Sequence, residues 1–136
     1  MKVEQAIEQA IEALQNCYVP YSKFHVAAAL VAKDGTCYTG VNIENASYPA
    51  TNCAERTAFF KAISEGVKEF SYIVIVGGME GKVTTYCSPC GICRQVMREF
   101  CSPSEFKVIL AKSTTDYKEY TLEEILPMGF GPESLI

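Results

Sequence analysis

The sequence predicts an α/β fold in which helices are layered against a mixed β-sheet. Three observations carry this prediction: apolar residues recur at helical spacing near the N-terminus, two β-prone runs flank a hairpin turn, and residues 72–77 form an unbroken apolar run. Such a run is typical of a strand that is buried on both faces. Because helical and strand-like segments alternate along the chain, we expect one layered sheet, whose strand order the pattern leaves open.

In the first half of the chain, the sequence predicts a helix followed by a β-hairpin. The helix is expected to run to about residue 17, with Pro20 ending it. Residues 24–32 and 36–43 are β-prone and meet at Lys33-Asp34-Gly35, a turn signal that predicts an antiparallel pair. The residues expected on the apolar face of the helix are Val3, Ile7, Ala10, Ile11 and Leu14.

In the second half of the chain, the sequence predicts two main helices, each followed by a strand. Residues 45–52 are expected to form a loop, and Gly66 is placed to close a helix over 53–64. The strand over 72–77 is expected at the centre of the sheet. The remaining expected elements are a loop over 77–89, a helix over 91–101 that Pro103 ends, strands over 106–111 and 117–121, and a short helix over 122–126 before an irregular tail.

Length and composition indicate a single globular domain that covers residues 1–136. Hydrophobic residues make up 49% of the chain and charged residues 21%, and no apolar run approaches the ~20 residues that a bilayer span needs. The acidic N-terminal residues do not resemble a signal peptide. We therefore expect a cytoplasmic protein without a membrane partner.

Charge and cysteine content narrow the class of function. The net charge of −4 argues against nucleic acid as a partner, because nucleic-acid binding depends on clustered Lys and Arg. A small uncharged substrate suits this balance better. The chain has 7 cysteines, an odd number that cannot pair completely, and reduced thiols point to metal or nucleophile chemistry.

Three cysteines are candidate metal ligands. Cys53 opens one predicted helix, and Cys90 and Cys93 open another, so their thiols can converge from two helix N-termini. A zinc ion with three protein ligands keeps its fourth position for water. Glu55 follows Cys53 by two residues and offers the carboxylate that general acid–base hydrolysis needs beside such a water. The sequence therefore predicts a catalytic zinc with Glu55 as proton shuttle.

The cysteine spacing leaves two other metal centres open. A lone Cys-x-x-Cys also occurs as half of a structural zinc site, which would make the chain a non-catalytic scaffold. Cys87, Cys90 and Cys93 together resemble part of an iron–sulfur ligand set, although no fourth cysteine follows at the ferredoxin spacing and Glu55 would then have no role. His25 is expected to be an ordinary strand residue. The cysteines expected to be packed thiols are Cys17, Cys37, Cys101 and, by the same argument, Cys87.

Arginine is predicted to tune the charge of the metal site. Three thiolates around Zn²⁺ leave a formal charge of −1, which makes the metal a poorer Lewis acid. Helix N-termini and guanidinium groups that donate to the sulfurs can offset this charge. Arg56 and Arg94 both lie close enough in sequence to do so, and we expect Arg56 to contribute most.

Four short motifs occur in order over nearly the whole chain: PYSKF at 20–24, NIEN at 42–45, CAER at 53–56 and PCGICRQ at 89–95. In these motifs the chain resembles the short, homotetrameric cytidine deaminases of the cytidine and deoxycytidylate deaminase family. Cys-x-Glu followed by Pro-Cys-x-x-Cys also fits the general signature of zinc deaminases. The resemblance implies a three-layer α/β/α fold with a central mixed sheet of about five strands.

The resemblance also implies a substrate site around one Zn²⁺ per subunit. Asn42 and Glu44 would bond the ribose hydroxyls of a free nucleoside, and their spacing of two at a strand end puts both side chains on the same side. Phe24 would pack on the base, and Ala54 would offer it backbone groups. The residues implied to enter the site of a neighbouring subunit, in a homotetramer with shared active sites, are Ala46, Tyr48 and Phe130.

The reaction implied is hydrolytic deamination of cytidine and deoxycytidine to uridine and deoxyuridine with release of ammonia, as in pyrimidine salvage. Zinc-activated water would attack C4 of the base while Glu55 moves protons. The alternatives within this chemistry are a blasticidin-type antibiotic or a base inside RNA or DNA as the substrate. The acidic net charge and the ribose-binding pair Asn42 and Glu44 favour the free nucleoside.

Overall fold

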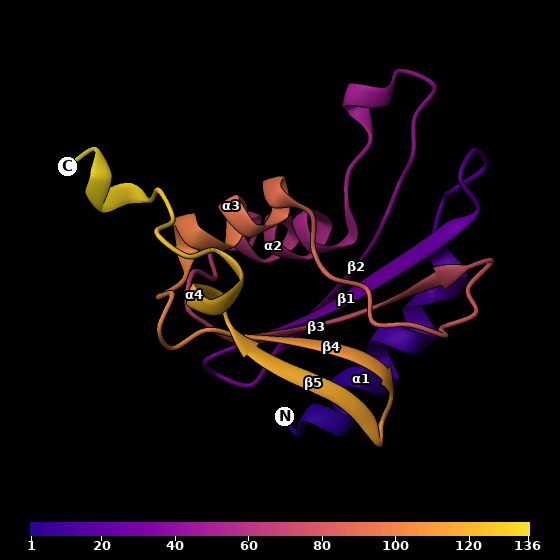
Figure 1. Cartoon of the computed structure of the whole chain (residues 1–136), viewed down its shortest axis with the longest axis horizontal. Helices are drawn as coiled ribbons and strands as arrows, with labels where there is room; N and C mark the ends of the chain where they lie inside the picture. Colours follow the sequence, from indigo (N-terminus) through magenta and orange to yellow (C-terminus); the bar gives the residue numbers. More distant parts are fainter.

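The computed structural model of the chain describes residues 1–136, and it has one five-stranded sheet with the strand order β2-β1-β3-β4-β5 (Figure 1). β3 and β4 are parallel, and the other neighbouring pairs are antiparallel. The mixed sheet and the central position of residues 72–77, which lie in β3, are therefore confirmed. The elements in chain order are α1 (Val3–Ala13), η1 (Leu14–Asn16), β1 (Phe24–Ala32), β2 (Cys37–Val41), η2 (Tyr48–Ala50), α2 (Ala54–Ser64), β3 (Phe70–Met79), α3 (Gly91–Phe100), β4 (Lys107–Ser113), β5 (Asp116–Thr121), α4 (Leu122–Ile125) and η3 (Pro132–Ser134).

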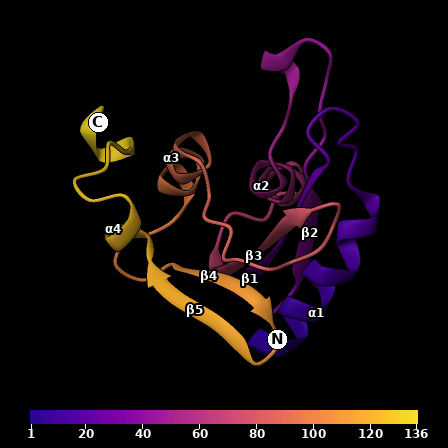
Figure 2. The same ribbon diagram turned by 45° about the vertical axis from the view of Figure 1, so that its right-hand side comes forward.

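Helices cover both faces of the sheet, so the fold has three layers. α1 packs on one face, and α2 and α3 lie side by side on the other (Figures 1 and 2). Each interface has its own apolar core: Ile7 and Val74 belong to the α1 side, whereas Phe59, Ile73 and Met97 belong to the α2 and α3 side. The predicted α/β/α arrangement is confirmed.

The buried face of α1 is turned from the predicted one toward the side that carries Ala6 and Ala13. Ala6, Ile7 and Ala10 are fully buried, and the two small alanines let the helix lie close to the sheet. Ile11 was expected on this face but is 38% exposed, because the helix contacts the sheet through the side that carries residues 6, 7 and 10.

None of the helices combines the length and the apolarity that a bilayer span requires.

A few element ends differ from the sequence prediction. The α-helical part of α1 ends at Ala13 and tightens into η1, so the helix has already ended before Pro20. β2 ends at Val41, and beyond it Ile43 forms an isolated bridge to Asn52. This bridge brings the segment after β2 beside the residues that directly precede Cys53.

α2 packs directly on the backbone of β2 at Gly40. A Cβ at this position would lie 2.4 Å from the backbone nitrogen of Ala58 and 2.5 Å from the carbonyl oxygen of Ala54, so only glycine fits. Gly66, with a φ of +89°, follows the end of the helix as predicted. This close contact fixes the position of the first turn of α2, which carries three of the predicted site residues, Ala54, Glu55 and Arg56.

Candidate active site

Two neighbouring helices each begin at a candidate ligand. Cys53 is the N-cap residue of α2 and Cys90 is the N-cap residue of α3, and neither thiol is used to cap its helix. Cys93 is buried in the first turn of α3. The three Sγ atoms lie within 4.8 Å of one another. The structure thus brings together the three thiols that the sequence predicted as ligands.

The separation of the sulfurs suits a tetrahedral zinc ion. The Sγ atoms of Cys53 and Cys90 are 3.8 Å apart. Tetrahedral zinc with Zn–S bonds of about 2.3 Å requires sulfur–sulfur distances of about 3.8 Å. All three cysteines are free of disulfide bonds, so their sulfurs are available as soft ligands. The donor set therefore fits zinc with three protein ligands.

Cys53 is the thiol that ionises most readily. A hydrogen bond from Cys93, assisted by the Arg56 guanidinium, lowers the pKa of Cys53 to about 5. Arg56 Nη2 donates to Cys53 Sγ over 3.1 Å, as expected of the residue predicted to tune the charge. The same hydrogen bond and burial raise the pKa of Cys93 above its ordinary value. Metal binding at this cluster would therefore release protons from the thiols that are still protonated.

Glu55 is the only charged residue whose side chain is buried, with 4% of its surface exposed. It lies in the first turn of α2, beside Cys53. Burial raises the pKa of Glu55 to about 7, and the negative charge of Cys53 adds to the effect. A carboxyl group with this pKa exchanges its proton near neutral pH, as a general acid–base group must.

Thr57 and Asn52 hold the start of α2 in place. Thr57 Oγ1 donates to the carbonyl oxygen of Cys53 over 3.0 Å and accepts a hydrogen bond from Asn52 Nδ2 over 3.0 Å. Sequence reasoning missed both residues. The only available signal was a threonine four residues after the N-cap, and many helices have one without any functional role.

Arg94 does not add the hydrogen bonds to sulfur that its position in the sequence suggested. Its Nε donates to the carbonyl oxygen of Pro89 over 2.8 Å, and its Nη1 donates to that of Ile125 over 2.5 Å. These backbone oxygens are better acceptors than a thiol. Arg94 therefore ties the residue before Cys90 to the end of α4, which supports the ligand loop without touching the ligands.

The remaining cysteines and the histidine lie outside the thiol cluster. Cys87 is not among the sulfurs that converge, and its Sγ packs against Gly77, 2.9 Å from the point that a Cβ would occupy there. The four-thiolate set of an iron–sulfur centre is thus not assembled. Nδ1 of His25 lies 3.1 Å from the carbonyl oxygen of Leu14, so the ring is bonded to backbone, as expected of a strand residue.

A cavity of about 490 Å³ lies between the turn before β1 and the segment around η2, and it includes Glu44 in its wall. Glu44 Oε1 accepts hydrogen bonds from the backbone nitrogens of Tyr21 and Ser22, each over 3.1 Å. The hydrogen bonds from Ser22 lower the pKa of Glu44, so this carboxylate stays charged. The residues that line the cavity are Tyr21, Ser22, Glu44, Asn45, Tyr48 and Thr51.

Asn42 is held between two backbone groups of β1. Its Oδ1 accepts from the nitrogen of Val26 over 3.0 Å, and its Nδ2 donates to the carbonyl oxygen of Phe24 over 2.9 Å. Each atom retains further hydrogen-bonding capacity, since an amide has two acceptor lone pairs and two donor hydrogens. Phe24 itself is half-buried at the start of β1.

The three residues that the resemblance assigned to a neighbouring subunit are exposed in the single chain. Tyr48 is 78% exposed and Phe130 is 56% exposed, and Ala46 is exposed as well. Ala46 and Tyr48 lie in the segment around η2, which projects away from the helix layer (Figures 1 and 2). Phe130 lies in the C-terminal tail. None of the three contributes to the core of its own chain.

Comparisons with known proteins identify the family of this chain. The family described as "Cytidine and deoxycytidylate deaminase zinc-binding region" matches residues 1–109. A cytidine deaminase of Sporosarcina psychrophila is 51% identical over 99% of this chain and 96% of its own length, and one of Halalkalibacterium halodurans is 48% identical over 99% and 98%. The crystal structure of a cytidine deaminase from Burkholderia pseudomallei superposes with a TM-score of 0.86 and 42% identity, over 96% of this chain and 100% of that chain.

Proposed function

Because this chain belongs to the cytidine and deoxycytidylate deaminase family, whose members are hydrolytic deaminases, we propose that it converts free cytidine and deoxycytidine to uridine and deoxyuridine with release of ammonia. The observation that carries the proposal is the buried carboxylate of Glu55 beside three convergent thiols. Burying a carboxylate is unfavourable, and a purely structural zinc centre would gain nothing from it.

Cys53, Cys90 and Cys93 would hold one zinc ion per chain. When bound, zinc supplies a Lewis acid that lowers the pKa of a water molecule, although three thiolate ligands weaken this effect. Arg56 donates to the Cys53 sulfur, and the backbone N–H groups at the starts of α2 and α3 carry partial positive charge. Both features stabilise the negative charge of a site whose ligands are all anionic.

Glu55 would move the protons of the reaction. In its ionised form it accepts a proton from the water that adds to C4 of the base, and it delivers that proton to N3. It then takes the remaining proton of the added water, now a hydroxyl on C4, and passes it to the amino group, which leaves as ammonia while C4 becomes a carbonyl. In the metal-free protein, burial raises the pKa of Glu55 to about 7, a direction that suits a group which takes up and releases protons near neutral pH.

Glu44 and Asn42 would bind the ribose. The hydrogen bonds from Tyr21 and Ser22 fix the Glu44 carboxylate in the cavity wall, where it can accept hydrogen bonds from sugar hydroxyls. A fixed negative charge also repels a 5′-phosphate, which favours nucleosides over nucleotides. Phe24 would pack on the base and Ala54, at the first position of α2, would offer it backbone groups that the helix leaves unpaired.

We also propose that the active enzyme is a homotetramer with shared sites. The exposure of Ala46, Tyr48 and Phe130 supports this, because exposed apolar residues on projecting segments are typical of interaction surfaces. Residues 1–136 would act as one catalytic domain in pyrimidine salvage. The proposed setting is the cytoplasm, where thiols stay reduced and able to bind metal.

The proposal is tested by comparing wild type with Glu55→Gln. Zinc per chain is measured first, and ultraviolet absorbance is then followed with cytidine, deoxycytidine, cytosine, CMP and blasticidin S. We expect the variant to keep zinc and nucleoside binding and to lose nearly all turnover. Glu65→Gln, at the exposed C-terminal end of the same helix, is the matched control and should turn over normally. Zinc-loaded wild type that acts on none of the five compounds would instead indicate a non-catalytic scaffold.

A further inference from the structure

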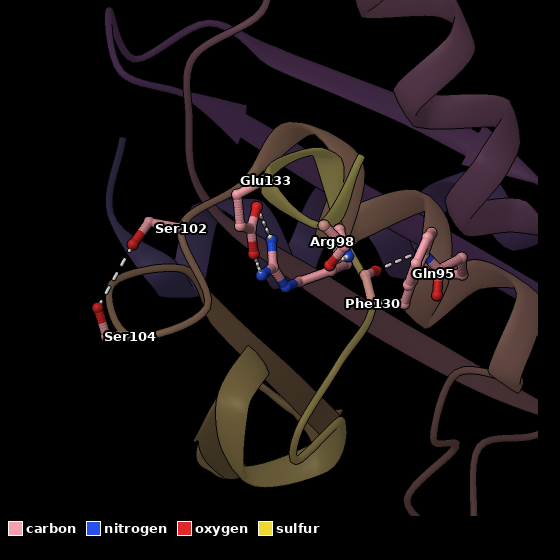
Figure 3. A network of polar contacts seen from close by, with 8 residues as sticks. Gln95, Arg98, Ser102, Ser104, Phe130 and Glu133 are labelled. Atoms are coloured by element: carbon pink, nitrogen blue, oxygen red, sulfur yellow. Dashed lines mark hydrogen bonds and ion pairs between the residues drawn. The ribbon is translucent and has the colours of Figure 1, made fainter. Parts of the chain in front are cut away.

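The C-terminal tail is fastened to α3, the helix that begins at Cys90 and carries Cys93 (Figure 3). Arg98 forms an ion pair with both carboxylate oxygens of Glu133, and its Nη1 donates to Glu133 Oε2 over 3.3 Å. Gln95 Nε2 donates to the carbonyl oxygen of Phe130 over 2.7 Å. Gln95 and Arg98 are three residues apart and therefore lie on the same face of the helix. Together they form a seat for the tail.

The seat is closely fitted around Gly131. A Cβ at this position would lie 2.3 Å from Nη1 and 2.5 Å from Cζ of Arg98. Gly131 is in an extended conformation, with φ −144° and ψ −173°, so alanine would be acceptable to the backbone there. A methyl group at this position would therefore push the Arg98 guanidinium away from the tail. The Arg98 side chain is only 11% exposed in this position.

The tail is held by its backbone and by Glu133, which leaves its apolar side chains free. Gln95 contacts the carbonyl oxygen of Phe130, and the Phe130 side chain is more than half exposed. Met128, Leu135 and Ile136 are exposed as well. A tail that is ordered by three polar contacts and still presents apolar side chains to solvent is suited to contact with another molecule.

The position of the tail indicates which molecule it contacts. The tail leaves the helix layer at the side opposite to the η2 segment, which borders the candidate nucleoside cavity (Figures 1 and 2). Fixed to α3, it does not reach the cavity of its own chain. A second copy of this chain offers the same cavity, with the exposed Tyr21 and Tyr48 in its wall.

We propose that Gln95 and Arg98 are positioning residues that hold the tail so that Phe130 is presented to the nucleoside site of a second copy of the chain. The inference rests on the proposed function and on its shared active sites. It adds that the helix bearing two zinc ligands also sets the position of a substrate contact in the neighbouring site. Removing the seat should therefore weaken nucleoside binding in the neighbour while leaving the chemistry at zinc intact.

The first experiment compares KM and kcat for cytidine in Arg98→Gln, Gly131→Ala and Phe130→Ala. We expect each variant to raise KM by about fivefold, since an aromatic contact contributes about 1 kcal/mol, and to change kcat by less than about twofold. Arg98→Gln should have little further effect in the Phe130→Ala background. The double variant Arg98→Glu with Glu133→Arg should recover most of the wild-type KM. Zinc content and oligomer mass are measured in parallel and should match wild type.

The second experiment tests action between chains. Arg98→Gln chains have an intact catalytic site and a released tail. They are co-expressed with Glu55→Gln chains, which have an inactive catalytic site and a tail that is still held by Arg98. At cytidine concentrations below KM, activity per Arg98→Gln chain should rise several-fold in the mixed oligomers. The matched control is co-expression with chains that carry both substitutions, which should give no rise.

Wild-type KM in both Arg98→Gln and Gly131→Ala, with a raised KM in Phe130→Ala, would refute the positioning role of α3 and leave only the contact made by Phe130. Active wild type with an unchanged KM in Phe130→Ala would overturn the role of the tail. Zinc-loaded wild type without turnover would overturn the proposed function and this inference together. Absence of complementation in mixed oligomers would show that the tail acts within its own chain and would also refute the inference.

Discussion

Replacing Glu55 with glutamine should make the metal-free protein more stable at alkaline pH, although it removes the group proposed to move protons. The Glu55 carboxyl is almost fully buried, and burial raises its pKa from 4.5 to about 7. Its charged form is therefore less favourable in the folded protein than in the unfolded chain. Glutamine has a similar shape and cannot ionise, so it avoids this penalty at every pH.

The magnitude follows from the difference between 4.5 and about 7. A pKa difference of about 2.5 corresponds to about 3 kcal/mol, because each pKa unit is worth about 1.36 kcal/mol. Since the folded-state pKa is raised, the contribution of this carboxyl to stability is complete below pH 4.5 and is lost as pH rises through about 7.

The assay is urea unfolding of metal-free wild type and Glu55→Gln under reducing conditions, followed by circular dichroism. The stability gap in favour of the variant should widen by about 2 to 3 kcal/mol between about pH 5 and about pH 8. Glu65→Gln, an exposed position on the same helix, is the control and should not widen the gap. A gap for Glu55→Gln that stays constant over this pH range would refute the reasoning about the buried carboxyl.

Three further outcomes are expected. Arg56→Gln removes the hydrogen bond to a ligand sulfur and should weaken zinc binding by about 10- to 100-fold, measured by competition with a chromophoric chelator; an unchanged affinity would contradict the charge-tuning role. Gly40→Ala drives a methyl group into the backbone of α2 near Ala58 and should lower stability by about 1 to 3 kcal/mol in thermal unfolding, whereas Gly91→Ala, with no atom within 4 Å of the new methyl group, should not. Cys87→Ser should keep the wild-type zinc content, because Cys87 lies outside the thiol cluster, and loss of zinc from this variant would make Cys87 a ligand after all.

Local patterns in the sequence predicted most of the elements and the convergence of the three thiols. The hairpin is an example: β1 spans Phe24–Ala32 as predicted and pairs antiparallel with β2. Cys53 and Cys90 were expected at helix starts, and both are N-cap residues. These features depend on residues that are near one another in sequence, so periodicity, turn signals and motif spacing were sufficient to find them.

Contacts between distant segments could not be predicted in the same way. Strand order depends on how whole elements pack, and no local period encodes it. Arg94 was considered as a donor to sulfur because of its neighbours in sequence, but its guanidinium contacts the carbonyl oxygen of Ile125, 31 residues away. The pairing of Arg98 with Glu133 spans 35 residues, and the residues next to either side chain do not predict it.

Ile11 illustrates a different limit. Its spacing from Ile7 is correct for the buried face of a helix, yet it is partly exposed because α1 faces the sheet with the side that carries Ala6, Ala10 and Ala13. The pattern of apolar residues thus predicted the presence of the helix and its general orientation. Which side of the helix faces the sheet depended on where small residues allow close contact, and the spacing of the larger apolar residues does not specify this.

The most direct test of the central claim is the rate of cytidine deamination as zinc is returned to metal-free protein. If Cys53, Cys90 and Cys93 hold the catalytic metal, activity should rise in proportion to zinc and level off at one zinc per chain, with ammonia released in step with uridine. Turnover by the metal-free protein, or one bound zinc per chain without turnover of cytidine, would contradict the account.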